Sequence, residues 1–226
     1  MPWELRFQKE YLRWLGDRLC DLKLIEDGEP VLNISSEIDR IITKYSCLIV
    51  DEKTCPHLCL TSFVLASYQA LSAGRLNRTQ ALDLIEDVFV GIGRTTLKLY
   101  TQALLMFSKD PFSAITGAGK KRALEQYGGA WEFRFEETDH SFTMISTKCF
   151  YHDFFMAAAA QELTRVFCSW DENWIKPIDL QHHENLDPFY GRPGSQRWHR
   201  GWGYHTVRKR ELLLREDGAF WGPSGR

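Results

Sequence analysis

The feature that most constrains the fold is a change of hydrophobic period near residue 130. Before it, apolar residues recur at the three- and four-residue spacing of amphipathic helices, as in residues 5–19. After it, Trp131, Phe133 and Phe135 alternate with charged residues, which is the pattern of a strand with one buried face. The sequence therefore predicts an α+β fold, in which a helical N-terminal half packs on a small antiparallel sheet.

Capping residues and helix breakers divide this pattern into elements. Pro56 suits the first turn of a helix, Asn77 can cap the next one, and the Asp110-Pro111 pair interrupts the helical pattern. After residue 174 the signals weaken, and we expect short strands and loops. We expect one α+β unit over residues 1–226, helical over 1–128 and strand–helix–strand over 129–226. The predicted helices lie near residues 5–19, 36–45, 55–74, 77–89, 95–107 and 150–166, with a short helix before residue 128, and the predicted strands lie over 131–136 and 141–148.

Composition narrows the class of protein. Hydrophobic residues make up 44% of the 226 residues, enough for a real core, and the formal net charge of -2 gives no general attraction to nucleic acid or to a membrane surface. No run of about 18 apolar residues occurs, so we expect no membrane span. The charged N-terminus lacks the apolar region of a signal peptide. We therefore expect a cytoplasmic protein whose cysteines are reduced.

Two cysteines bracket the helix that is predicted after the second strand. Cys149 stands where the strand gives way to the helix, and His152 follows three residues later, on the same side of the first helical turn. A helix N-terminus and a nearby imidazolium both lower the pKa of a thiol. Cys168 and Asp171, also three residues apart, repeat this spacing at the other end of the predicted helix. The pattern favours a nucleophilic Cys149, and the alternative is that both cysteines simply pack, as free cysteines usually do.

A zinc site is a second interpretation of the same residues. Cys149, His152, Cys168 and His205 offer two sulfur and two nitrogen ligands, which suit zinc. Their spacing is permissive for such a site but not diagnostic of it.

Three residues near the start of the third predicted helix look like metal ligands on paper. Cys55 and Cys59 would share a helix face, but His57 would point elsewhere. We therefore interpret Cys55 and Cys59 as packing residues and assign His57 no function.

Several stretches around these cysteines resemble the L-2-amino-thiazoline-4-carboxylic acid hydrolase family. The resemblance rests on a strand-ending Cys149, a following helix, and the Glu-Leu and Phe-Cys pairs that lead to Asp171. The helix over residues 65–71 and the aromatic strand over residues 131–135 also match the family's pattern. Together these stretches extend the resemblance over roughly residues 55 to 207.

One position departs from the family's pattern. The family's last motif consists of an Arg, a Ser or Thr three residues later, a Gly, and a Cys four residues after the Gly. Arg192, Ser195 and Gly201 fit this motif, with about two extra residues before Gly201. His205 stands where the family has its Cys.

The resemblance implies a hydrolase that acts on a non-peptide C–N bond in a small cyclic amidine or imine. The type reaction opens a thiazoline ring to a carbamoyl-cysteine product. We expect Cys149 to attack the electrophilic ring carbon, with His152 as the proton shuttle and with Asp171 or His205 orienting the imidazole or activating water. We expect no cofactor. Three residues are expected to contact a carboxylate-bearing substrate: Arg192, Ser195 and Trp131.

Other functions remain open at this point. A lyase or cyclase of a biosynthetic pathway could use the same cleft, and a protein that only binds a small ligand or zinc would explain the missing family cysteine. The basic and aromatic residues over 192–210 could contact nucleic acid, but the rest of the chain is acidic, so we favour a pocket for a small anion. Whether the chain forms a homodimer is left open.

Overall fold

The computed structural model describes residues 3–25, 34–74, 76–138, 141–171, 173 and 203–208. Of residues 3–5, 105, 111, 141 and 203–208 it describes the backbone alone. The helices are α1 (Trp3–Asp21), α2 (Ser35–Tyr45), α3 (Thr54–Gly74), α4 (Arg78–Phe107), α5 (Pro111–Gln126), α6 (Phe150–Ala157) and α7 (Thr164–Trp170), with the short 3-10 turns η1 (Ser46–Leu48) and η2 (Gln161–Leu163). The strands are β1 (Glu132–Glu137), β2 (Ser141–Lys148) and β3 (Gly203–Arg208). The predicted α+β class is confirmed.

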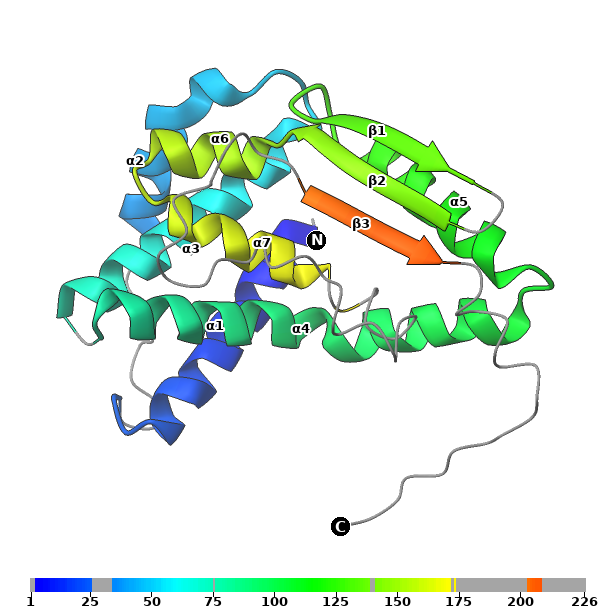
Figure 1. The fold of residues 1–226 in the computed structure, drawn as a ribbon. Helices are drawn as coiled ribbons and strands as arrows, with labels where there is room; N and C mark the ends of the chain where they lie inside the picture. The colour runs from blue at the N-terminus through cyan, green and yellow to red at the C-terminus, as the bar shows by residue number, and fades with distance from the viewer. Residues whose placement is uncertain are drawn as a thin grey trace, which may run out of the picture.

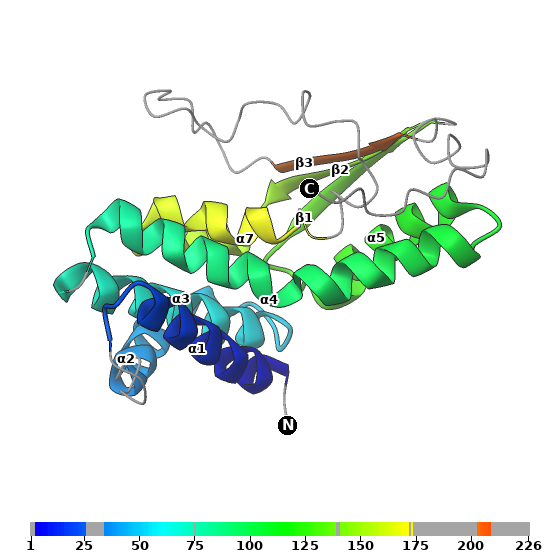
Figure 2. The ribbon, with the colours of Figure 1, turned by 90° about the horizontal axis from the view of Figure 1, so that it is seen from below.

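Helix α3 is the centre of the helical body. It is buried along most of its length and packs against α1, α2, α4 and α6. Helix α4 runs along the whole molecule: its first half lies against α1, α3 and α7, and its second half lies beside α5 (Figures 1 and 2). No helix in the described ranges is long and apolar enough to cross a membrane.

The sheet is antiparallel, with the strand order β1-β2-β3. The side chains of β1 alternate as the sequence predicted: Phe133 and Phe135 point to one side of the strand, and the charged residues beside them point to the other. Phe142 of β2 packs with Phe112 and Ile115 of α5, so α5 covers one face of the sheet (Figure 1). Strand β3 comes from the C-terminal region, where the sequence predicted short strands without fixing their place.

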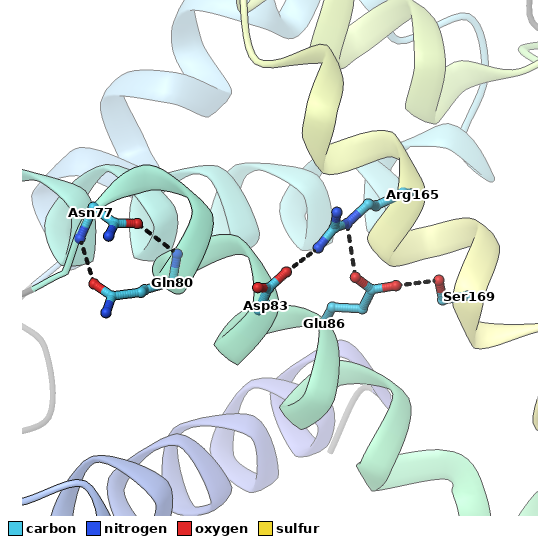
Figure 3. A network of polar contacts seen from close by, with 6 residues as sticks. All are labelled: Asn77, Gln80, Asp83, Glu86, Arg165 and Ser169. Carbon is cyan, nitrogen blue, oxygen red and sulfur yellow. Dashed lines mark hydrogen bonds and ion pairs between the residues drawn. The ribbon is translucent and has the colours of Figure 1, made fainter. Parts of the chain in front are cut away.

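The two helices predicted over 77–89 and 95–107 are one continuous helix, α4. Asn77 caps it as predicted: its side chain accepts a hydrogen bond from the Gln80 backbone N–H, and the Gln80 side chain accepts one from the Asn77 N–H (Figure 3). Gly91 and Gly93 lie inside this helix and leave space for Trp14 and Trp170 respectively.

The prediction of one continuous helix over residues 150–166 is wrong. Helix α6 ends at Ala157, and Ala159 adopts a left-handed backbone with φ 53°. Ala160 and Ala159 then donate backbone hydrogen bonds to the carbonyls of Phe155 and Met156, which is the Schellman arrangement. An alanine run favours helix locally, so it is the burial of residues 160 and 163–164 that stops it here.

Helix α7 is fixed to α4 by polar contacts. The Arg165 guanidinium pairs with Asp83, and its Nε lies 2.8 Å from Glu86 Oε2. Ser169 Oγ donates to the other oxygen of Glu86 at 2.5 Å (Figure 3). These contacts hold α7, and therefore the segment that leads to Asp171, against the first half of α4.

We expect Gly93→Ala to lower the free energy of unfolding by about 1–3 kcal/mol. A Cβ at position 93 would lie 2.5 Å from Trp170 ring atoms, and Trp170 is itself packed between Phe7 and Phe89. Gly117→Ala is the matched control, because no atom of another part of the described chain lies within 4 Å of its added Cβ. There the better helix propensity of alanine should raise stability by about 0.5–1 kcal/mol. Denaturant unfolding of both variants gives the sign of each change in the free energy of unfolding. Changes of the same sign in both variants would contradict this packing.

Candidate active site

Cys149 occupies the junction that the sequence predicted. It is the N-cap residue of α6, directly after β2, with an extended backbone (φ -139°, ψ 114°). Three N–H donors approach its sulfur: the backbone N–H groups of Tyr151 and His152 and the Trp131 side chain. Because these donors favour a negatively charged sulfur, the site is built to hold a thiolate once one forms.

The pKa of Cys149 nevertheless moves in the direction opposite to the one expected from its place at a helix start. Burial of the thiol raises the pKa, and the three N–H donors only partly offset it. The nearby Asp153 carboxylate raises it further. The thiol therefore stays protonated near neutral pH, and a base must remove its proton before or during attack.

Four aromatic rings gather beside Cys149. His57 of α3 lies with its ring centroid 4.5 Å from Trp131, 5.5 Å from Tyr151 and 5.6 Å from Tyr127, the last in a stacked arrangement. Trp131 also contacts Tyr127 at 4.9 Å and Tyr151 at 5.4 Å. We call His57, Tyr127, Trp131 and Tyr151 the aromatic cluster. Trp131 contacts the thiol directly, and the other three rings pack against Trp131.

The aromatic cluster contains a short polar contact. His57 Nδ1 lies 2.7 Å from the Tyr151 hydroxyl, and His57 Nε2 lies 3.5 Å from the Gln126 carbonyl oxygen. His57 is buried, with 8% of its surface exposed. Both ring nitrogens are thus directed at groups far away in the sequence.

One partly buried cation and one carboxylate face the cluster. Burial lowers the pKa of Arg122 on α5, but the neighbouring Tyr127, Asp171 and Tyr151 more than compensate, so the net change is upward. Arg122 hydrogen-bonds Tyr127, while its Nε has no hydrogen-bond partner among the residues that the structure describes. Burial, followed by the Asp171 charge, raises the pKa of Tyr127. Both Tyr127 and Tyr151 therefore carry their protons at neutral pH.

A carboxylate at the surface fixes the segment that carries Tyr127 and Trp131. Asp51 Oδ1 accepts hydrogen bonds from the Thr54 N–H and hydroxyl at 2.9 and 2.7 Å, at the start of α3, and Asp51 Oδ2 accepts one from the Gly129 N–H at 2.6 Å. A Cβ at Gly128 would collide with this carboxylate. Tyr127 also borders an open depression of about 500 Å³ between these elements, lined by Asp51, Glu52, Lys53, Leu124, Tyr127, Gly128 and Gly129.

The structure brings together three of the residues that the sequence predicted. The Trp131 side chain donates a hydrogen bond to the Cys149 sulfur. Asp171, at the end of α7, interacts electrostatically with Tyr127 and Tyr151. His152 offers the thiol its backbone N–H. On α6, His152 follows Tyr151, and consecutive helical residues point about 100° apart.

The structure describes only some of the other predicted site residues. Cys168 is partly buried on α7, next to Phe167, whose ring lies 4.3 Å from that of Tyr151. The backbone of His205 in β3 pairs with Met144 of β2. Arg192 and Ser195 lie outside the described residues.

The proposed zinc ligands do not form a group within the described part of the chain. No three His, Cys, Asp or Glu side chains there are arranged so that they could hold a metal ion. The His205 side chain, the fourth member of that set, lies outside the described side chains.

Sequence reasoning missed four members of the site: His57, Arg122, Tyr127 and Tyr151. His57 was given no function because it does not share a helix face with its neighbouring cysteines. The one available signal was the aromatic run next to Cys149, in which Tyr151 follows two residues after the thiol. Nothing in the sequence near Arg122 sets it apart from other helical arginines.

Comparison with known proteins assigns the chain that carries this site to a family. Residues 57–183 match the model of the L-2-amino-thiazoline-4-carboxylic acid hydrolase family. The match spans more than half of the 226 residues and includes Cys149, the aromatic cluster, Arg122 and Asp171. Comparisons with curated proteins and with solved structures gave no match. The chain belongs to the L-2-amino-thiazoline-4-carboxylic acid hydrolase family.

Proposed function

We propose that the protein is a hydrolase that opens a non-peptide C–N bond of a small cyclic amidine, with a 2-amino-thiazoline-4-carboxylate as the substrate of the type reaction. The observation that supports this most directly is the Cys149 site. Within the matched family span, a thiol at a strand–helix junction faces three N–H donors and a wall of aromatic rings. Such a site suits attack on a flat, electrophilic carbon.

The reaction divides into two steps. First, the Cys149 sulfur bonds to the amidine carbon, the ring C–N bond breaks, and the departing nitrogen takes up a proton. Water then adds to the same carbon and displaces the sulfur, which leaves a carbamoyl group on the product and restores the thiol. One water molecule is consumed, and no oxidant or reductant is needed.

The substrate carboxylate requires a cationic partner. The sequence offers Arg192, and the structure adds Arg122, whose guanidinium faces the aromatic cluster with one nitrogen available. Asp171 partly balances the Arg122 charge. We propose Trp131 and Ser195 as further substrate contacts, with Asp171 or His205 orienting the attacking water.

Incubation of the purified full chain with 2-amino-thiazoline-4-carboxylate in ¹⁸O-labelled water tests this function. We expect a carbamoyl-cysteine product that carries one labelled oxygen, observed by mass spectrometry. Turnover without label would indicate a lyase or cyclase, and the absence of both turnover and a Cys149 adduct would contradict a catalytic role. The analogue 2-amino-thiazoline, which lacks the carboxylate, should show a higher KM. Zinc analysis of the same sample tests the alternative site of Cys149, His152, Cys168 and His205.

A further inference from the structure

Attack by a protonated, buried thiol requires a proton acceptor. Burial raises the pKa of Cys149, so the helix start alone does not supply the thiolate. The sequence suggested His152, but the contribution of His152 to the sulfur is its backbone N–H. The question is which side chain of this site accepts the proton.

The hydrogen-bonded pair of Tyr151 and His57 can provide this acceptor. The Asp153 carboxylate also acts on the thiol, but it is exposed. The Tyr151 hydroxyl lies 2.7 Å from His57 Nδ1, a normal length for a strong O–H···N hydrogen bond. His57 Nε2 faces the Gln126 carbonyl, which can only accept. With the ring proton on Nε2, the tautomer that these two contacts favour, Nδ1 accepts the hydrogen bond from Tyr151.

Trp131 contacts both the thiol and Tyr151. Its side chain donates to the Cys149 sulfur, and its ring meets the Tyr151 ring at 5.4 Å with an interplanar angle of 81°. Tyr151 also interacts electrostatically with Cys149. The charged or titratable groups that face Tyr151 and His57 are Cys149, Tyr127, Arg122 and Asp171.

We propose that Tyr151 and His57 form the proton-transfer pair of this site, a role that rests on the proposed nucleophile Cys149. As the sulfur attacks, its proton moves to the Tyr151 oxygen while the Tyr151 proton moves to His57 Nδ1, so the sulfur bonds to the substrate carbon and His57 becomes an imidazolium. The Gln126 carbonyl stabilises the imidazolium through Nε2–H. When the ring opens, the same path in reverse delivers the proton to the departing nitrogen. His57 acts through Tyr151 and is therefore a positioning residue.

Tyr151→Phe and His57→Gln test the pair with two readouts. The first is the rate of Cys149 alkylation by iodoacetamide as a function of pH, with the labelled cysteine identified by mass spectrometry and no substrate present. We expect both variants to move the midpoint of this profile to higher pH, because the thiol then ionises without its acceptor. The second readout is kcat for ring opening, which should fall by about 10²–10⁴-fold, the usual effect of losing a general base.

Two further variants make the outcome specific. Tyr45→Phe removes a different tyrosine hydroxyl, one that lies 3.4 Å from the Ala157 carbonyl, and should leave both readouts unchanged. His152→Gln removes the competing acceptor, and we expect a smaller effect than for His57→Gln. A larger effect of His152→Gln, or unchanged profiles in both Tyr151→Phe and His57→Gln, would overturn the pair. Tyr151→Phe keeps the ring, so it carries the test if His57→Gln fails to fold.

The two readouts separate this inference from the proposed function. If the alkylation profile shifts but the thiazoline is not turned over, the pair stands and the proposed substrate is wrong. If Cys149-dependent turnover persists in Tyr151→Phe with an unshifted profile, the hydrolase stands and the pair is wrong.

Discussion

Replacement of Cys149 by alanine is expected to reduce hydrolysis by at least about 10³-fold, as removal of a covalent nucleophile does in other enzymes. The variant lacks the atom that would bond to the amidine carbon, and neither Tyr151 nor His57 can replace it at that place. The substitution also removes the sulfur that the backbone N–H groups of Tyr151 and His152 approach at the start of α6, so the fold of the variant is checked directly. The measurement is the initial rate of product formation at saturating substrate, with circular dichroism to show that the fold is kept.

Cys47→Ala is the matched control for this variant. Cys47 is an exposed cysteine in η1, so its loss should leave kcat within error of the parent protein. Full turnover by Cys149→Ala would show that the nucleophile is wrongly assigned. In that case, water activated by Asp171 or His205 becomes the better explanation.

Phe154→Ala is expected to cost about 3–5 kcal/mol of stability, the usual range for truncating a fully buried phenylalanine. The Phe154 side chain is 0% exposed, and its ring lies 5.1 Å from both Tyr45 and Phe155. The loss is a large share of the total stability of an average domain. It would also loosen α6, the helix whose first turn holds Cys149. Guanidinium unfolding, monitored by fluorescence, gives the change in free energy.

Phe107→Ala provides the comparison for the core variant. Phe107 is 82% exposed at the end of α4, so the same chemical change should alter stability by less than about 0.5 kcal/mol. Similar costs for the two variants would contradict the core assignment, because the expected difference comes entirely from burial.

The family match and the departure from the family's last motif concern different parts of the chain. Residues 57–183 include the thiol, the aromatic cluster, Arg122 and Asp171. Arg192, Ser195 and His205 lie beyond the matched span. The proposed chemical centre therefore lies inside the family match, while the predicted carboxylate clamp and His205, which stands at the position of the family's cysteine, lie outside it.

The local sequence was sufficient to predict the elements that depend only on residues close together in the chain. The alternation at Phe133 and Phe135 predicted β1, and Asn77 predicted the start of α4, because pleating and capping depend on residues a few positions apart. The end of α6 could not be predicted in this way. Ala159 takes a left-handed backbone that alanine disfavours, and only the packing of the residues around it compensates that cost.

By itself, the sequence determined that a helical half meets an antiparallel sheet, that Cys149 stands at a strand–helix junction, and which family the junction resembles. The tertiary structure decided what surrounds the thiol. His57 meets Tyr151 across 94 positions of sequence, and Arg122 and Asp171 come to the same cluster from two further helical segments. The structure also decided the direction of the Cys149 pKa, because desolvation depends on everything that packs around a group, whereas the helix-start effect depends only on its neighbours in the chain.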